Sequence, residues 1–214
     1  MPVICLVRHG QASYVTEDDA LTPLGRAQAA AVGGELARRS LREPYLLSGT
    51  LTRQRDTARL LADAAGYEQP LQQDRRWNEY DHIALLTRYA QPPQDAHSVQ
   101  ELLDRALLAW MADTAATGGE GWPSFTERAS AALADLRTAL GQGRDAVVVT
   151  SGGLLAAVCG KLLSLPPEGI VAFNRVTVNA SVTTLVTGRS GTSLLTFNDH
   201  SHFTGNRRGL LTYR

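Results

Sequence analysis

Short apolar segments alternate with amphipathic segments along most of the chain, and this alternation restricts the possible folds more than any other feature. Residues 3–7, 45–48 and 146–150 are apolar and partly β-branched, which is typical of buried strands. The segments between them repeat their apolar residues at helical spacing. Because buried strands that alternate with helices form parallel sheets covered on both faces, we predict a three-layer α/β/α sandwich with a mostly parallel central sheet.

Cap residues set the bounds of the predicted helices. Thr22 before Pro23 is typical of a helix start, and Gly66 is typical of a helix end. Ser124, with Glu127 three residues later, matches the pattern of a capping box. The predicted helices cover residues 23–39, 51–65, 99–116, 124–140 and 154–163, and two later strands are predicted at residues 181–186 and 193–197.

The middle of the chain has a different character. Residues 77–95 lack a clear period, and a glycine-rich turn at 118–123 follows the next predicted helix. We therefore expect one domain over residues 1–214, with a helical insertion of about residues 77–123 over the active-site end of the sheet.

Charge, hydropathy and cysteine content exclude several classes of function. The chain has 21 Lys+Arg and 21 Asp+Glu, so no overall field attracts nucleic acid or an anionic membrane. No apolar segment approaches the roughly 18 to 20 residues that span a bilayer, and the start lacks a signal-peptide pattern. Cys5 and Cys159 have apolar neighbours in the sequence, which favours reduced thiols. We expect a cytoplasmic protein that binds neither nucleic acid nor membrane.

Polar turns follow three of the predicted strands, where ligands bind in sheets of this kind. They are residues 8–10, 48–53 and 150–153. Arg8 and Arg53 could hold a phosphate dianion while the neutral imidazole of His9 attacks phosphorus. Amides near Gly152, at a helix start, would bind the same oxygens. This set favours phosphoryl transfer without a metal ion.

Phosphoryl transfer also needs an acid that protonates the leaving alcohol. Glu79, in an irregular segment, is the candidate, and Asp81 is the rival. Gln11, Ser13 and Thr22 flank the first polar turn and could orient phosphate or substrate, although turn and cap roles explain the same residues.

These residues, taken in order, resemble the histidine phosphatase, or phosphoglycerate mutase-like, superfamily. The resemblance covers nearly the whole chain and rests on residues 8–10, 21–29, 48–58, 148–153 and 179–181. It implies a phosphohistidine at His9, a phosphate pocket that includes Arg8 and Arg53, and Glu79 as proton donor. It also implies that the site uses no metal ion and no other cofactor.

The sequence departs from that family at Ser151. Members normally carry a second histidine there, whose positive charge would stabilise the transferring oxygens. The loss of one oriented oxyanion donor costs roughly 10²- to 10³-fold in rate. Ser151 can still donate a hydrogen bond beside a helix start. An attenuated enzyme is therefore expected in preference to an inactive one.

Whether another histidine replaces the positive charge that Ser151 lacks is left open. His82, His200 and His202 could each supply the missing charge, but exposed loop positions are the favoured interpretation. Asp199 beside two of them suggests a metal site only superficially, because no second cluster matches it. His97 has no evident partner.

The leading hypothesis is a phosphomonoesterase acting on a small phosphorylated substrate. A phosphoryl-ligand-binding or regulatory module is the alternative that Ser151 motivates. A phosphoglycerate-type mutase is less favoured, because the sequence lacks the Glu-Arg-x-Tyr-Gly run of those enzymes and has Val15 near the place of an expected asparagine. A homo-oligomer is left open, as are subunit or substrate contacts of the basic residues Arg207, Arg208 and Arg214.

Overall fold

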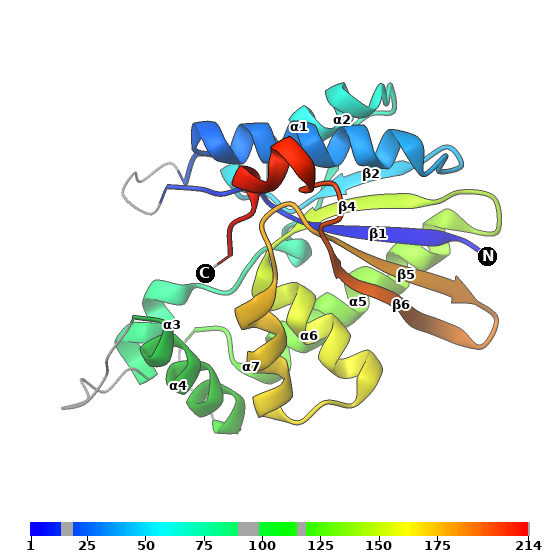
Figure 1. Cartoon of the computed structure of the whole chain (residues 1–214). Coiled ribbons are helices and arrows are strands. Elements are labelled where there is room, and N and C mark those ends of the chain that lie inside the picture. The colour runs from blue at the N-terminus through cyan, green and yellow to red at the C-terminus, as the bar shows by residue number, and fades with distance from the viewer. Residues whose placement is uncertain (14–18, 90–98, 115–118, 214) are drawn as a thin grey trace.

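A six-stranded sheet forms the centre of the molecule (Figure 1). The computed structural model describes residues 1–13, 19–89, 99–114 and 119–213, and the sheet is formed by strands within these ranges. The strand order is β3-β2-β4-β1-β5-β6. The strands are β1 (Val3–Arg8), β2 (Tyr45–Ser48), β3 (Gln72–Gln73), β4 (Ala146–Thr150), β5 (Val182–Gly188) and β6 (Gly191–Asp199).

Most of the sheet is parallel, as the sequence predicts. β1 pairs in parallel with β4, and β4 with β2, while β5 runs antiparallel to both β1 and β6. Arg8 lies opposite Thr150 in the register, and Ser48 lies opposite Val149. The carboxyl ends of three parallel strands therefore meet at one edge of the sheet.

Helices cover both faces of the sheet and produce the predicted three layers (Figure 1). They are α1 (Pro23–Arg38), α2 (Thr52–Ala65), α3 (His82–Tyr89), α4 (Val99–Ala112), α5 (Trp122–Leu140), α6 (Gly152–Leu163) and α7 (Pro167–Val176), with short 3₁₀ helices η1 (Arg75–Trp77) and η2 (Gly205–Leu210). Alternate residues of β1 enter different cores, with Cys5 and Val7 packing on the side of α1 and α2. Ile4 and Leu6 pack on the side of α5 and α6. This period of two is the expected consequence of pleating.

Two of the predicted helix caps are confirmed and one is wrong. The Thr22 hydroxyl accepts a hydrogen bond from Gly25 N at 3.0 Å, and Gly66 ends α2 in the left-handed conformation. Ser124 does not cap α5, which begins two residues earlier with Gly121 as its cap. Pro123 suits the first turn of a helix, and the Trp122 ring packs 5.7 Å from that of Phe125, so the helix starts before Ser124.

Several elements differ from the sequence prediction. α3 lies in the stretch that lacks a clear period, and neither α7 nor β3 is predicted. β3 has only two residues and cannot show a period, whereas α7 begins with Pro167 at its first position, which is a helix-start signal. α6 begins at Gly152 rather than at residue 154, because Ser151 is its cap residue.

α3 and α4 lie at the edge of the sheet where β1 ends (Figure 1). They fall within residues 77–123, the predicted insertion, and an ion pair between Asp104 of α4 and Arg175 of α7 joins them to the sheet-covering helices.

Among the described helices, none combines the length and the apolar content needed to cross a membrane. Burial raises the pKa of the Cys5 thiol to about 11 and that of Cys159 to about 12, so both thiols stay protonated.

Candidate active site

The turns that follow β1 and β4 lie side by side. His9 N donates to the carbonyl oxygen of Thr150 at 2.9 Å, which continues the pairing of the two strands past their ends. The first turn, residues 8–10, and the second turn, residues 151–153, are therefore neighbours at the carboxyl edge of the sheet.

His9 is buried, and its two ring nitrogens have different partners. Nδ1 lies 2.7 Å from the carbonyl oxygen of Gly10, which can only accept a hydrogen bond. Nε2 lies 3.1 Å from Nε of Arg53, which can only donate one. Both contacts favour the same tautomer, with the proton on Nδ1 and a lone pair on Nε2.

Two buried guanidinium groups flank the first turn. Arg53, at the start of α2, forms an ion pair with Asp19 in addition to its contact with His9. Arg8 donates to the carbonyl oxygen of Thr177. The planar donors of these two guanidinium groups can bind the oxygens of an anion beside His9, although Asp19 balances the charge of Arg53.

Glu79 reaches the second turn. Its Oε2 accepts a hydrogen bond from Gly153 N at 2.8 Å, so the carboxyl group is bound to the first turn of α6. A Cβ on Gly153 would lie 2.5 Å from Glu79 Oε1 and 2.2 Å from Tyr80 Cε1, and only glycine allows this approach. The rival acid, Asp81, is exposed and accepts hydrogen bonds from Ile83 N and Ala84 N at 3.0 Å, so it caps α3 instead.

Ser151 has a partner that the sequence analysis did not identify. Gln54 Nε2 donates to Ser151 Oγ at 2.9 Å and to the carbonyl oxygen of Trp77 at 3.1 Å. The side chains of Gln54 and Ser151 belong to residues that are both 0% exposed. A polar residue directly after Arg53 on a helix was the only sequence signal for this contact. Gln54 thus connects α2, the segment leading to Glu79 and the second turn.

Gln11, Ser13 and Thr22 are engaged in turn and cap contacts. The Thr22 hydroxyl donates to Gln11 Oε1 at 2.9 Å, and Ser13 N donates to the carbonyl oxygen of Ala20 at 2.9 Å. A role for these three residues in substrate binding stays a prediction.

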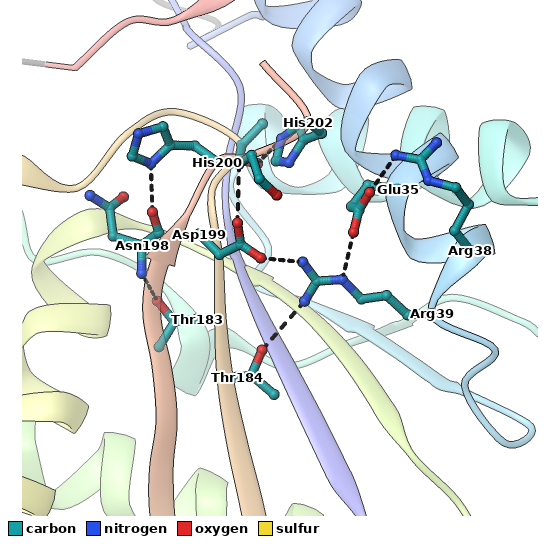
Figure 2. A network of polar contacts seen from close by, with 11 residues as sticks. Glu35, Arg38, Arg39, Thr183, Thr184, Asn198, Asp199, His200 and His202 are labelled. Carbon is teal, nitrogen blue, oxygen red and sulfur yellow. Dashed lines mark hydrogen bonds and ion pairs between the residues drawn. The ribbon is translucent and has the colours of Figure 1, made fainter. Parts of the chain in front are cut away.

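Figure 2 shows where His200 and His202 lie. His202 is 5% exposed, and its Nε2 lies 3.1 Å from the carbonyl oxygen of Ala180. Burial lowers its pKa to about 4, so it is neutral at neutral pH and supplies no positive charge there. His200 Nδ1 lies 2.6 Å from the carbonyl oxygen of Asn198, while Asp199 pairs with Arg39 at 2.6 Å (Figure 2).

The structure also locates His82 and bears on the question of a metal site. His82 begins α3 and is half-buried. His97, Val15 and Arg214 lie outside the described residues. Within the described ranges, no group of three or more His, Cys, Asp or Glu side chains is arranged to hold a metal ion.

Residues that follow α7 donate hydrogen bonds to the backbone of the first turn. Ala180 N donates to the carbonyl oxygen of Arg8 at 3.0 Å, and Asn179 Nδ2 donates to that of His9 at 3.2 Å. Ala180 has a positive φ of 55°, which lets its backbone reach the turn. The segment between α7 and β5 is thus part of the site.

Comparisons with known proteins identify the family of the chain. The sequence profile of the histidine phosphatase superfamily (branch 1) matches residues 4–200. A glucosyl-3-phosphoglycerate phosphatase of Mycolicibacterium vanbaalenii is 34% identical over 181 residues, covering 77% of this chain and 76% of that protein. A Salmonella paratyphi C protein named "Probable phosphoglycerate mutase GpmB" is 32% identical over 170 residues, covering 76% of this chain and 75% of its own length.

A solved structure is also similar. It is that of a mycobacterial glucosyl-3-phosphoglycerate phosphatase in complex with VO₃, with a TM-score of 0.66 and 28% sequence identity. The alignment covers 93% of this chain and 100% of that one. The likeness therefore extends over nearly the whole fold.

Proposed function

The chain belongs to the histidine phosphatase superfamily, and from this premise we propose that it is a metal-independent phosphomonoesterase that forms a phosphohistidine at His9. The observation that carries the proposal is the tautomer of His9. Its Nε2 lone pair lies beside Arg53, where a phosphoryl group is attracted, while Nδ1 donates to Gly10. A neutral imidazole in this state is a nucleophile without prior deprotonation.

The first step transfers the phosphoryl group from substrate to His9. The Nε2 lone pair forms a bond to phosphorus, and the bond from phosphorus to the ester oxygen breaks. Glu79, as the neutral acid, gives its proton to the departing alkoxide. Arg8, Arg53 and the amides at the start of α6 stabilise the equatorial oxygens of the transferring group.

The second step returns the enzyme to its starting state. A water molecule attacks phosphorus while the Glu79 carboxylate accepts one of its protons, and the bond from nitrogen to phosphorus breaks. Inorganic phosphate leaves, His9 regains its lone pair and Glu79 is again an acid. Atoms and charges balance over the cycle without a metal ion or a cofactor.

Ser151 is expected to reduce the rate. Its hydroxyl is uncharged and receives a hydrogen bond from Gln54, so the second turn contributes backbone donors and no cation. The deficit is expected to be about 10²- to 10³-fold relative to a site with a cationic donor. The same observation supports the second candidate, a phosphoryl-ligand-binding module with little turnover.

The relatives support a small phosphorylated substrate. One is a glucosyl-3-phosphoglycerate phosphatase, which makes phosphate esters of small polar alcohols the first class to test. Another is a probable mutase by name, but hydrolysis is favoured here because the Glu-Arg-x-Tyr-Gly run is absent. We propose a cytoplasmic enzyme and leave a homo-oligomer open.

Hydrolysis of an aryl phosphate in the presence of a chelator tests the proposal. The wild type should release phosphate, and His9→Ala should lose about 10⁴-fold or more of that activity. A rapid quench should trap an acid-labile phosphoenzyme in the wild type alone. Equal activity of the two proteins would overturn the proposal. Phosphate binding with no turnover and no phosphoenzyme would support the binding module instead.

A further inference from the structure

The carboxyl-terminal end of α7 lies against the first turn. Arg8 donates to the carbonyl oxygen of Thr177, which directly follows the last residue of α7. The hydroxyl of Thr177 donates in turn to the carbonyl oxygen of Phe173 at 2.7 Å, which holds this end of the helix closed. A side chain in the last turn of α7 is therefore close to the Arg8 guanidinium.

Asn174 occupies that position. It is 5% exposed, and its carboxamide packs against the start of α6. A Cβ on Gly152 would lie 3.0 Å from Asn174 Oδ1 and 3.5 Å from Arg8 Nε. The lack of a side chain at Gly152 thus leaves room for a carboxamide and a guanidinium to approach the first turn of a twelve-residue helix.

The carboxamide has no partner of its own. Within the part of the chain that the structure describes, the Asn174 side chain forms no hydrogen bond. The Asn174 amide atoms do not belong to the fully buried side-chain atoms that lack a partner, so they border accessible space that a ligand can fill. The backbone N–H groups at a helix start favour an anion at the same place. Two independent features therefore point to a bound anion between Arg8 and α6.

We propose that the Asn174 carboxamide donates a hydrogen bond to a non-bridging oxygen of the phosphoryl group. This inference rests on the proposed function and deepens it. Ser151 has its hydroxyl held by Gln54, so Asn174 is the side chain that supplies a neutral donor on the α6 side of the phosphoryl group. His9 and Arg53 contact the group from the α2 side.

Equilibrium binding of inorganic phosphate and orthovanadate to the full chain tests the proposal. Asn174→Ala should weaken both by about 10- to 100-fold, as expected for the loss of one hydrogen bond to a charged ligand. Asn174→Asp keeps the shape but places a carboxylate beside the anion. Its defect relative to the wild type should shrink as the pH falls, because the protonated carboxyl is again a donor. A purely structural role would lower the urea-unfolding stability of Asn174→Asp over the same pH range, whereas the proposal predicts weaker anion binding at unchanged stability.

Arg175→Ala is the matched control. Arg175 is the next residue of α7 and pairs with Asp104 of α4, so the variant loosens α7 without touching the proposed ligand. Anion binding within about twofold of the wild type in both Asn174 variants would overturn the proposal, as would an equal loss in Arg175→Ala. Because binding needs no turnover, an inactive wild type would overturn the phosphatase proposal and leave this one testable.

Discussion

The first and second turns follow neighbouring strands at the same edge of the sheet, yet their central side chains have opposite surroundings. His9 receives a hydrogen bond from a charged donor and keeps a lone pair that faces Arg53. Ser151 receives one from a neutral donor and is fully buried. The two donors, Arg53 and Gln54, are successive residues of α2.

This comparison shows how one helix can determine the chemistry of two turns. Successive helical residues point about 100° apart, so Arg53 and Gln54 reach different strands from a single turn of α2. A strand end therefore provides only a place for a functional side chain. The neighbour that reaches it from another element decides whether it carries charge, donates or is held in the core.

The largest effect in the second turn is expected from the acid that it binds. Glu79→Gln removes the proposed proton donor but keeps a group that can accept from Gly153 N. For alkyl phosphates, whose leaving groups need the proton, kcat should fall by about 10²- to 10⁴-fold. Aryl phosphates with good leaving groups should lose much less. A leaving-group series with equal losses throughout would exclude Glu79 as the donor.

Replacing the Gln54–Ser151 pair should give the second turn a charged donor, as the first turn has in Arg53. Ser151→His alone inserts a ring where Gln54 fills the space, so it should lower stability by about 1–3 kcal/mol. Gln54→Ala/Ser151→His has room for the ring and should raise kcat by up to about 10²-fold. A double-mutant cycle in kcat and in Tm measures the coupling. Additive effects would show that the two residues act independently.

Gly153→Ala tests the geometry of the second turn. The new methyl group would displace the Glu79 carboxyl and the Tyr80 ring, so we expect roughly a tenfold loss of kcat and a loss of about 1–3 kcal/mol in stability. Gly34→Ala in α1 is the matched control, because its Cβ meets nothing within 4 Å. That variant should gain about 0.5–1 kcal/mol in urea unfolding. Unchanged kcat in Gly153→Ala would mean that the contact with Glu79 is unimportant.

The first turn is supported by a residue that contacts a histidine, whereas the second turn is bound by the Glu79 carboxyl group. His202 lies against the Ala180 carbonyl, and Ala180 N binds the first turn. Burial lowers the His202 pKa from 6.5 to about 4, although Glu35 and Asp199 oppose the shift and Arg39 adds to it. Between these values the unfolded chain binds a proton that the folded chain does not, so stability falls as the pH drops.

Urea unfolding at pH 7 and pH 5 measures this contribution. The wild type should lose about 2 kcal/mol from His202 between these values, since one pKa unit corresponds to about 1.4 kcal/mol. His202→Gln removes the titrating group and should lose correspondingly less. An equal loss in both proteins would assign the acid sensitivity to other groups.

Local sequence patterns were sufficient for the central part of the fold. The apolar runs of β1, β2 and β4 are continuous because both faces of these strands are buried, and the caps at Thr22 and Gly66 depend on residues close in sequence. α3 and α7 have eight and ten residues, fewer than the roughly 11 over which a helical period is usually judged, although Pro167 at the start of α7 is a local signal. The start of α5 is marked locally by Pro123, and the rings of Trp122 and Phe125 also pack on Trp110, which lies more than ten residues away in the sequence.

For the candidate site, the sequence by itself determined which residue types follow the strands, because strand ends and helix caps are encoded within a few positions. Only the tertiary structure decided their partners. The tautomer of His9, the contact of Gln54 with Ser151 and the approach of Asn174 to Gly152 each join segments that are far apart in the chain. Such contacts depend on the packing of helices on the sheet, which a local pattern cannot specify.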